Sequence, residues 1–483
     1  MTASRRATLD LLRRTASDPR RRVLVRNATV VTADPLLGTL AGADVLVEGS
    51  AIASVGRSLP VGDAVVVDAT GMIAAPGFVD THRHAWEAQL RRIMPDVDDL
   101  GAYVRSTLLG YAPAYRPEDM GTGTRLAALT AIDSGITTML DFSHNSRTAA
   151  HSDAAVRALR DTGIRGVHAA MAPHFGPWDH QWPADLARLR ERYAHDRLTF
   201  RLACLATDEV AGPGLAYGPE LARHARELGV GVSVDAVFGE PSSRAILEWE
   251  RQGLLGPDVT LIHATGLTAD AWRAIGDTGT TVALAPTSDA QIGLETAVPA
   301  VDEALAVGVR PGLSIDVEVA LSSDMFTQMR ALLAIQHMRA VEGAYGTDRQ
   351  PSRIGVADVL DFATLQGART TGLGRTTGSL TPGKQADLVL VTAEAVNTMP
   401  LNDPVGTLVL GADARNVDTV LIGGRVRKWA GELLDVDLAA LRDEVAASRD
   451  HILAAAAGAI AGVAPRSGSR SAAHPLRVPD RAR

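Results

Sequence analysis

Cysteine is almost absent from this chain of 483 residues, which contains only one. A single cysteine excludes an internal disulfide framework and any zinc site built from several cysteines, and it is typical of a reducing compartment. The sequence also lacks an apolar run of about 18 residues or more, so no membrane span is expected. The Arg-containing start lacks the apolar core of a secretory signal. We therefore expect a soluble, cytoplasmic protein without a membrane partner.

Basic residues are also fewer than acidic residues. The 48 Lys and Arg residues are outnumbered by 56 Asp and Glu, which gives a formal net charge of −8. This balance offers no basic surface to nucleic acid, so a nucleic-acid partner is not expected. Apolar residues make up 46% of the chain, too many for a disordered protein, and the length allows a large core.

Two strand-rich regions flank a central region in which strands and helices alternate. Residues 23–75 and 378–430 contain short Val-rich segments of period-two alternation, which is typical of antiparallel sheet. Neither region has enough strands to bury a face alone, so we expect them to form one composite β-sandwich. Residues 76–377 contain eight short apolar runs separated by helical periodicity, which predicts a (β/α)8 TIM barrel. The predicted fold class is α/β.

Three terminal segments complete the expected organisation. Residues 1–22 are interpreted as an N-terminal tail, residues 431–462 as a C-terminal helix, and residues 463–483 as a disordered tail rich in Ser, Arg and Pro.

Polar residues that end the barrel strands are the candidates for chemistry, because functional groups gather at the carboxyl ends of such strands. The first strand ends in His82-Arg83-His84, and strand alternation places both imidazoles on one face, where they can share a cation. The sixth strand ends in His263 and the eighth in Asp316. Each alone could be a helix N-cap or a core group, but together with the histidine pair they suit zinc, iron or manganese. Asp316 could then accept a proton from water beside the metal.

The motifs PGFVDTHRH, IHATG and SID, bracketed by ATVVTADPLLGTLAGADVLVEGSAIASVG and GSLTPGKQADLVLVTAE, resemble the amidohydrolase superfamily. The likeness is closer to its branch of cytosine deaminases, adenosylhomocysteine deaminases and triazine chlorohydrolases, and it covers residues 23–428. The resemblance implies a β-sandwich made from both chain ends beside a barrel that holds one divalent metal, zinc first, with iron or manganese as alternatives. It also implies an enzyme that hydrolyses carbon–nitrogen bonds other than peptide bonds, and a homo-oligomer.

Individual positions match this family's motifs. His82 and His84 match the paired metal ligands of the first strand, and Asp316 matches the ligand and base of the last strand. His263 matches the sixth-strand histidine, which in this branch contacts substrate or the developing oxyanion and moves protons. Asp289, in ALAPTSDAQIG, lies where the family's substrate loop carries Asn.

The fifth strand departs from the family pattern. The family's metal-binding His and the Glu three residues later align with Asp235 and Phe238. Asp235 could still bind the metal through oxygen. Phe238 cannot shuttle a proton as the Glu of the deaminases does, and Glu240 or Glu318 could replace that Glu only if its loop turns inward. An aminopyrimidine or aminopurine deaminase is therefore not the favoured function.

The rest of the barrel mouth is expected to contact a flat or apolar small molecule through aromatic and imidazole side chains. Residues 86–115 form a predicted lid. The candidates for substrate binding are Trp86, His144, His174, Trp178, Asp289 and Glu318. The alternative for each aromatic is that it only packs a loop onto the barrel.

The favoured function is metal-dependent hydrolysis of a C–N bond in a small cyclic or aromatic substrate by metal-activated water. Asp316 would act as base and His263 would polarise the electrophile. Three alternatives stay open. They are a metal-dependent lyase or dehydratase of a specialised biosynthetic pathway, an aminopyrimidine- or aminopurine-type deaminase, and a metal-free barrel that binds a ligand or a partner protein.

Overall fold

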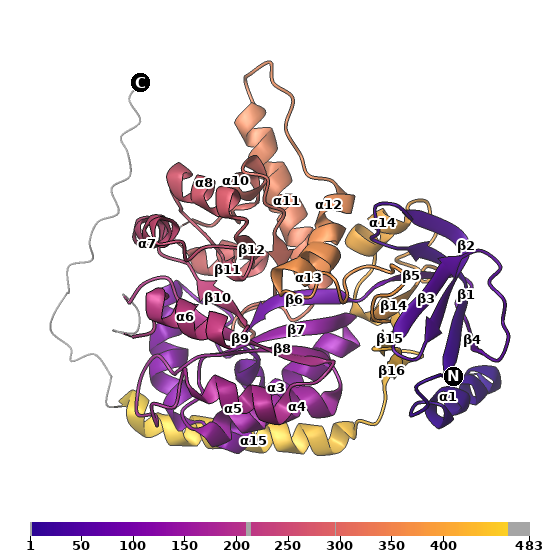
Figure 1. The fold of residues 1–483 in the computed structure, drawn as a ribbon, viewed down its shortest axis with the longest axis horizontal. Helices are drawn as coiled ribbons and strands as arrows, with labels where there is room; N and C mark the ends of the chain where they lie inside the picture. The colour runs from indigo at the N-terminus through magenta and orange to yellow at the C-terminus, as the bar shows by residue number, and fades with distance from the viewer. Residues whose placement is uncertain (1, 209–213, 295, 462–483) are drawn as a thin grey trace.

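A parallel barrel forms the larger part of the computed structural model, which describes residues 2–208, 214–294 and 296–461 (Figure 1). Its eight strands are hydrogen-bonded in the order in which they occur along the chain, and an isolated parallel bridge between Arg83 and Asp316 joins the last strand region to the first. The predicted (β/α)8 barrel is therefore confirmed. The strands are β6 (Phe78–Arg83), β7 (Ile136–Ser143), β8 (Arg165–Ala170), β9 (Leu198–Leu205), β10 (Gly231–Asp235), β11 (Val259–Ile262), β12 (Thr281–Leu284) and β13 (Gly312–Leu313).

Helices surround the barrel and bury their apolar faces against its strands (Figure 1). Two of them, α4 and α8, end at Gly163 and Gly279 in the left-handed conformation, which glycine adopts without a side-chain penalty. The longer helices are α3 (Pro117–Asp133), α4 (Ala149–Thr162), α5 (Asp185–Tyr193), α6 (Pro219–Glu227), α7 (Gly239–Arg251), α8 (Ala269–Thr278), α10 (Val301–Ala306), α11 (Met325–Ala344) and α12 (Val356–Asp361). Shorter turns are α9 (Pro286–Ser288), η4 (Asp289–Gly293), η5 (Phe362–Gln366), α13 (Gly367–Thr370), α14 (Pro404–Gly406), η6 (Thr407–Gly411) and η7 (Ala414–Asn416).

Strands from both ends of the chain form a second, largely antiparallel sheet beside the barrel (Figure 1). Its order is β17-β16-β15-β14-β5-β1-β2-β3, and β4 also pairs with β1. The pairing of the two strand-rich regions, which the sequence predicts, is thus confirmed. The strands are β1 (Arg22–Val31), β2 (Thr39–Glu48), β3 (Ala51–Gly56), β4 (Val65–Asp68), β5 (Met72–Pro76), β14 (Leu388–Thr392), β15 (Val417–Ile422), β16 (Arg425–Trp429) and β17 (Glu432–Leu433).

A buried ion pair ties this sheet to the barrel. Nε of Arg165, at the start of β8, donates to Oδ2 of Asp387 over 2.6 Å, and both side chains are almost fully buried. Asp387 also accepts the backbone N–H of Gly423. Close packing continues at Gly77, between β5 and β6, where a Cβ atom would lie 2.1 Å from the side chain of Thr137.

The chain after β6 crosses the carboxyl end of the barrel as the segment expected to be a lid. It contains η1 (Ala85–Leu90), α2 (Leu100–Tyr103), η2 (Val104–Tyr111) and η3 (Ala112–Ala114). Helix α15 (Leu438–Ala461) lies along α3 at the bottom of Figure 1. Its Ser448 hydroxyl donates to Asp119 of α3 and accepts from Gln89 of η1, so this helix braces the base of the lid.

The terminal segments differ in what the structure describes. Within residues 1–22, interpreted from the sequence as a tail, the structure contains helix α1 (Ala3–Arg14), whose Leu9 and Leu12 pack against the sheet. The expected disordered tail, residues 463–483, lies outside the described residues. Within the described ranges, no helix has the length and apolarity needed to cross a membrane.

Candidate metal centre and active site

His82, His84 and Asp316 meet at the carboxyl end of the barrel. Nε2 of His82 and Nε2 of His84 each lie 3.2 Å from Oδ1 of Asp316. Two backbone hydrogen bonds hold the segments together: Asp316 N–H donates to the His82 carbonyl, and His84 N–H donates to the Asp316 carbonyl. All three side chains are buried. The structure therefore brings together three ligands that the sequence predicts.

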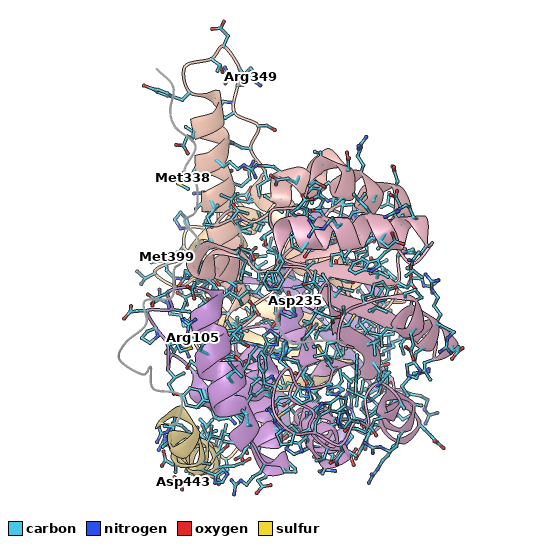
Figure 2. The ribbon with its side chains drawn as sticks, turned by 90° about the vertical axis from the view of Figure 1, so that its left-hand side faces the viewer. Arg105, Asp235, Met338, Arg349, Met399 and Asp443 are labelled. Carbon is cyan, nitrogen blue, oxygen red and sulfur yellow. The ribbon has the colours of Figure 1, made fainter. Side chains whose placement is uncertain are left out.

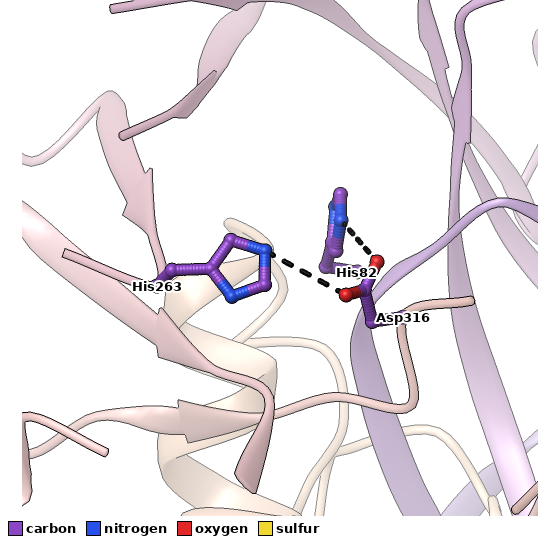
Figure 3. A group of neighbouring side chains, drawn as sticks. All are labelled: His82, His263 and Asp316. Atoms are coloured by element: carbon purple, nitrogen blue, oxygen red, sulfur yellow. Dashed lines mark hydrogen bonds and ion pairs between the residues drawn. The ribbon is translucent and has the colours of Figure 1, made fainter. Parts of the chain in front are cut away.

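His263 and Asp235 border this group. Nε2 of His263 lies 3.7 Å from Oδ2 of Asp316 and 4.0 Å from Oδ1 of Asp235. Figure 3 shows His263 facing Asp316 and His82, and one ligand atom from each of these three residues lies within 4.8 Å of the others. Asp235 ends β10 with its side chain 20% exposed. Residues at the ends of four strands thus bring nitrogen and oxygen donors to the same end of the barrel.

The donor set fits a divalent cation. An ion bound tetrahedrally through bonds of about 2.0 Å separates its ligand atoms by about 3.3 Å, close to the two 3.2 Å contacts of Asp316. Oδ1 of Asp235 is buried and has no hydrogen-bond partner within the described part of the chain. A buried carboxylate in that state is costly unless a cation is nearby. His82, His84 and Asp316 could hold such an ion, with Asp235 as a further oxygen donor.

Asp289 fixes the orientation of His263. Its Oδ1 lies 2.7 Å from Nδ1 of His263, which leaves Nε2 facing Asp316. Burial lowers the pKa of His263, but the hydrogen bond and the negative charge of Asp289 outweigh burial and raise this pKa to about 9. Without a bound cation, His263 is therefore protonated at neutral pH.

Asp316 has the opposite protonation behaviour. Burial alone would raise its pKa, but the hydrogen bonds from His82 and His84 hold the pKa of Asp316 well below its ordinary value. Ser288 also donates a hydrogen bond to Oδ2 of Asp316. Asp316 is therefore an ionised carboxylate that already accepts several hydrogen bonds.

His263 and Asp316 both adopt an uncommon backbone conformation. His263 has a φ of +64° and Asp316 a φ of +67°, in the left-handed region that non-glycine residues rarely occupy. Such a conformation costs on the order of 1 kcal/mol or more and persists where the surroundings impose it, often in active sites. The strain aims both side chains at the centre of the group.

A small cavity of about 50 Å³, which opens to solvent, lies over the group. Its polar wall is formed by His84, His144, His174, Asp235, His263 and Asp316. Its apolar wall includes Leu100, Val104, Leu108, Phe238, Ile292 and Leu294. Figure 2 views the molecule from the side opposite the sheet, with Asp235 near the centre and Arg105 of the lid below it. Lid residues therefore form part of the cavity wall.

His144 and His174, expected to contact substrate, line this cavity. Their Nδ1 atoms lie 3.2 Å apart, and the His144 ring packs edge-to-face on His84 with centroids 4.0 Å apart. Nε2 of His144 is buried without a hydrogen-bond partner among the described residues. Burial lowers the pKa of His174 to about 3 and that of His144 well below its ordinary value, so both are neutral.

Trp86, Trp178 and Glu318, also expected to bind substrate, lie outside the lining of this cavity. Trp86 is completely buried and packs edge-to-face on Tyr115, with centroids 4.8 Å apart. Trp178 borders a neighbouring hollow with His180. The alternative reading, that these tryptophans pack loops onto the barrel, describes their placement better.

Glu318 and Glu240 do not occupy the place of the family's Glu. Glu318 is buried between Arg83, at 3.1 Å, and Arg91. Burial would raise its pKa, but the two guanidinium groups lower the pKa to about 2. Glu240 is exposed on α7 beside Arg244. The wall at this position is Phe238.

Three contributors to the site are missed by the sequence reasoning. Ser288 precedes Asp289 in the segment ALAPTSDAQIG, so its position beside a candidate residue is a signal that could have found it. The other two are Tyr103 and Glu87. Tyr103 lines the cavity and donates a hydrogen bond to buried Glu87 over 2.6 Å. No pattern in the lid sequence distinguishes Tyr103 and Glu87 from their neighbours.

Comparisons with known proteins agree with this architecture. A model of the amidohydrolase family matches residues 243–427. The chain is 27% identical over 432 residues to a 5-methylthioadenosine/S-adenosylhomocysteine deaminase of Moorella thermoacetica, covering 86% of this chain and 96% of the relative. A deaminase of the same name from Pelotomaculum thermopropionicum is 28% identical over 437 residues, covering 86% and 95%.

Solved structures share the fold. An adenosine deaminase from Xanthomonas campestris with bound zinc superposes with a TM-score of 0.77 at 22% identity, covering 89% of this chain and 98% of that one. An atrazine chlorohydrolase from Arthrobacter aurescens complexed with zinc gives a TM-score of 0.74 at 21% identity, covering 88% and 100%. The family model and the deaminase relatives confirm the resemblance to the amidohydrolase superfamily, and the solved structures show that the fold is shared.

Proposed function

We propose that this chain is a metal-dependent hydrolase that cleaves a C–N bond of a small cyclic or aromatic substrate with water. The observation that supports this most directly is the buried group of His82, His84 and Asp316, with its two 3.2 Å nitrogen–oxygen contacts. The relatives named as deaminases support the reaction class.

Zinc is the proposed metal, with iron or manganese as alternatives. His82, His84 and Asp316 would hold it, and Asp235 would add an oxygen donor in place of the family's fifth-strand histidine. Two of the solved relatives carry zinc. When bound, such an ion makes hydroxide available from water near neutral pH.

The chain's own residues would orient the reactants and move protons. Asp316 would accept the proton that water loses, because its carboxylate lines the cavity beside the proposed metal ligands. His263, oriented by Asp289, would donate a hydrogen bond to the oxygen that becomes negative. His144 and His174 would contact the substrate from the opposite wall.

A lyase or dehydratase is the second candidate, favoured by Phe238 in the place of the proton-shuttling Glu. Turnover in ¹⁸O-labelled water separates the two reactions. Hydrolysis places solvent oxygen in the product, whereas a simple elimination leaves the product unlabelled.

Metal analysis tests the proposal. Purified protein supplied with zinc should hold about one ion per chain, and His82→Ala and Asp316→Asn should lose it together with activity. His180→Ala is the matched control, because His180 is exposed and lies outside the cavity lining. Wild-type protein that stays below stoichiometric metal after addition of zinc, manganese or iron would contradict the proposal.

A homo-oligomer and a cytoplasmic location remain further proposals. The oligomer is proposed because Met338 and Val341 of α11, and Tyr345 directly after this helix, expose apolar surface. Light scattering of the purified protein tests it, and a monomeric mass would contradict it. The location is proposed on the free, buried Cys204 alone.

A further inference from the structure

Apolar side chains make up much of the cavity lining, and they come from several separate segments of the chain. Leu108 comes from the lid, Phe238 follows β10, and Ile292 follows β12. Leu108 and Ile292 are only 5% and 4% exposed. A substituent on a substrate that enters this region is therefore surrounded by hydrocarbon and removed from water.

No lysine or arginine contributes to the cavity lining in the described ranges of the chain. Three arginines close in sequence to lining residues lie outside the lining themselves. Arg83 and Arg91 pair with Glu318, and Arg147 donates to the carbonyl oxygens of Ala112 and Pro177. A carboxylate or phosphate of a ligand in the cavity would therefore meet no guanidinium group in the described lining.

The polar wall has no surplus positive charge either. Asp235 and Asp316 would together balance one divalent cation, and Asp289 is paired with His263. With these charges balanced, a carboxylate or phosphate brought into this wall would lose its hydration without gaining an unpaired cation, which is strongly unfavourable.

We infer that the cavity takes an uncharged ring compound with an apolar substituent and rejects the same ring when its substituent carries a carboxylate or a phosphate. This inference rests on the proposed function and narrows its substrate class. The inference distinguishes between the two substrates for which the deaminase relatives are named. The substituent of methylthioadenosine ends in a methyl group, whereas that of adenosylhomocysteine ends in an amino acid.

A matched ligand series tests the inference by calorimetry on zinc-loaded protein. The series consists of 5′-methylthioadenosine, its S-carboxymethyl analogue and the methyl ester of that analogue, with atrazine and an N-carboxyalkyl atrazine as a second ring. The ester is larger than the acid but uncharged, so it separates charge from size. We expect the uncharged members to bind at least about tenfold more tightly than the acids. Equal or tighter binding of an acid, or no binding by any uncharged member, would overturn the inference.

A variant that adds a positive charge to the cavity lining provides a second test of the inference. Val104 lines the cavity from the lid and is partly exposed, so Val104→Arg should narrow or reverse the preference for the ester over the acid. Leu109→Arg is the control, because Leu109 is 46% exposed and outside the lining, and it should keep the wild-type ranking. If Val104→Arg is folded by its melting curve and the ranking is unchanged, the inference falls. If that variant does not fold, the wild-type ligand series still decides.

The binding preference between acid and ester is measured independently of catalytic activity. Binding is measured on zinc-loaded and zinc-free protein in parallel, so a protein that takes up no zinc overturns the proposed function while the ranking of acid and ester is still read. A protein that holds zinc and hydrolyses but prefers the acids overturns only the substrate class.

Discussion

His263 and Asp289 form a buried pair whose protonation depends on their contact. The pKa of His263 is about 9 although burial opposes the charge, because Asp289 accepts its Nδ1 proton. A folded-state pKa above the ordinary value of about 6.5 contributes stability that is complete below that value and is lost as pH rises through about 9.

Replacement of Asp289 tests this coupling in metal-free protein. Asp289→Asn keeps the shape of the side chain but removes its charge, so the pKa of His263 should fall toward its ordinary value. Imidazole nitrogen NMR should show His263 titrating near pH 9 in the wild type and lower in the variant. A wild-type midpoint near 6.5 would contradict the pairing.

Asp235 stands where the family resemblance implies a metal-binding histidine, and its proposed role as a ligand is testable. Asp235→Asn should weaken zinc binding by at least about tenfold, since a neutral amide replaces a carboxylate donor. Asp235→His should retain binding, because imidazole is a good ligand at this position. Competition with a chelator measures both. Unchanged affinity in Asp235→Asn would show that Asp235 stays outside the coordination sphere.

A deeply buried hydrogen bond joins two parts of the lid, because the Tyr103 hydroxyl of α2 donates to Glu87 of η1. Tyr103 is 6% exposed and Glu87 is completely buried, with its second oxygen lacking a partner among the described residues. Loss of the tyrosine hydroxyl would leave the other carboxyl oxygen unsatisfied as well.

Tyr103→Phe should therefore lower the free energy of unfolding by about 1–3 kcal/mol. Urea denaturation measures the loss, and proteolysis within residues 100–111 should speed up. Tyr345→Phe is the matched control, since Tyr345 is 88% exposed. Equal stability of wild type and Tyr103→Phe would mean that water replaces the hydroxyl without cost.

Much of the architecture could be predicted from the sequence because its signals are local. Strand alternation is sufficient to place His82 and His84 on one face, and apolar runs mark all eight barrel strands. The placement of Trp86 and Glu318 could not be predicted, because it depends on Tyr115 and on Arg91, which lie elsewhere in the chain. Likewise, no sequence motif predicts that Asp316 adopts a left-handed backbone conformation.

The barrel and the sheet depend on each other through Arg165 and Asp387. Breaking a buried ion pair by removing one partner leaves an uncompensated charge, which costs about 3–5 kcal/mol. Asp387→Ala should therefore destabilise the whole chain by that amount in denaturant unfolding. Asp161→Ala is the control, because the Arg160–Asp161 pair is exposed. A loss below about 1 kcal/mol would show that this ion pair contributes little to the junction of barrel and sheet.

The neighbours of β5 set an order of assembly during synthesis. One edge of β5 pairs with β1. Its other edge pairs with β14, which is translated after the entire barrel, so this edge stays unpaired until then. At ordinary elongation rates this interval lasts on the order of tens of seconds. Throughout it a nascent chain on the ribosome carries an open strand edge able to pair with other polypeptides. Premature release before residue 388 should therefore yield aggregates, and folding in the cell should benefit from a chaperone that shields this edge.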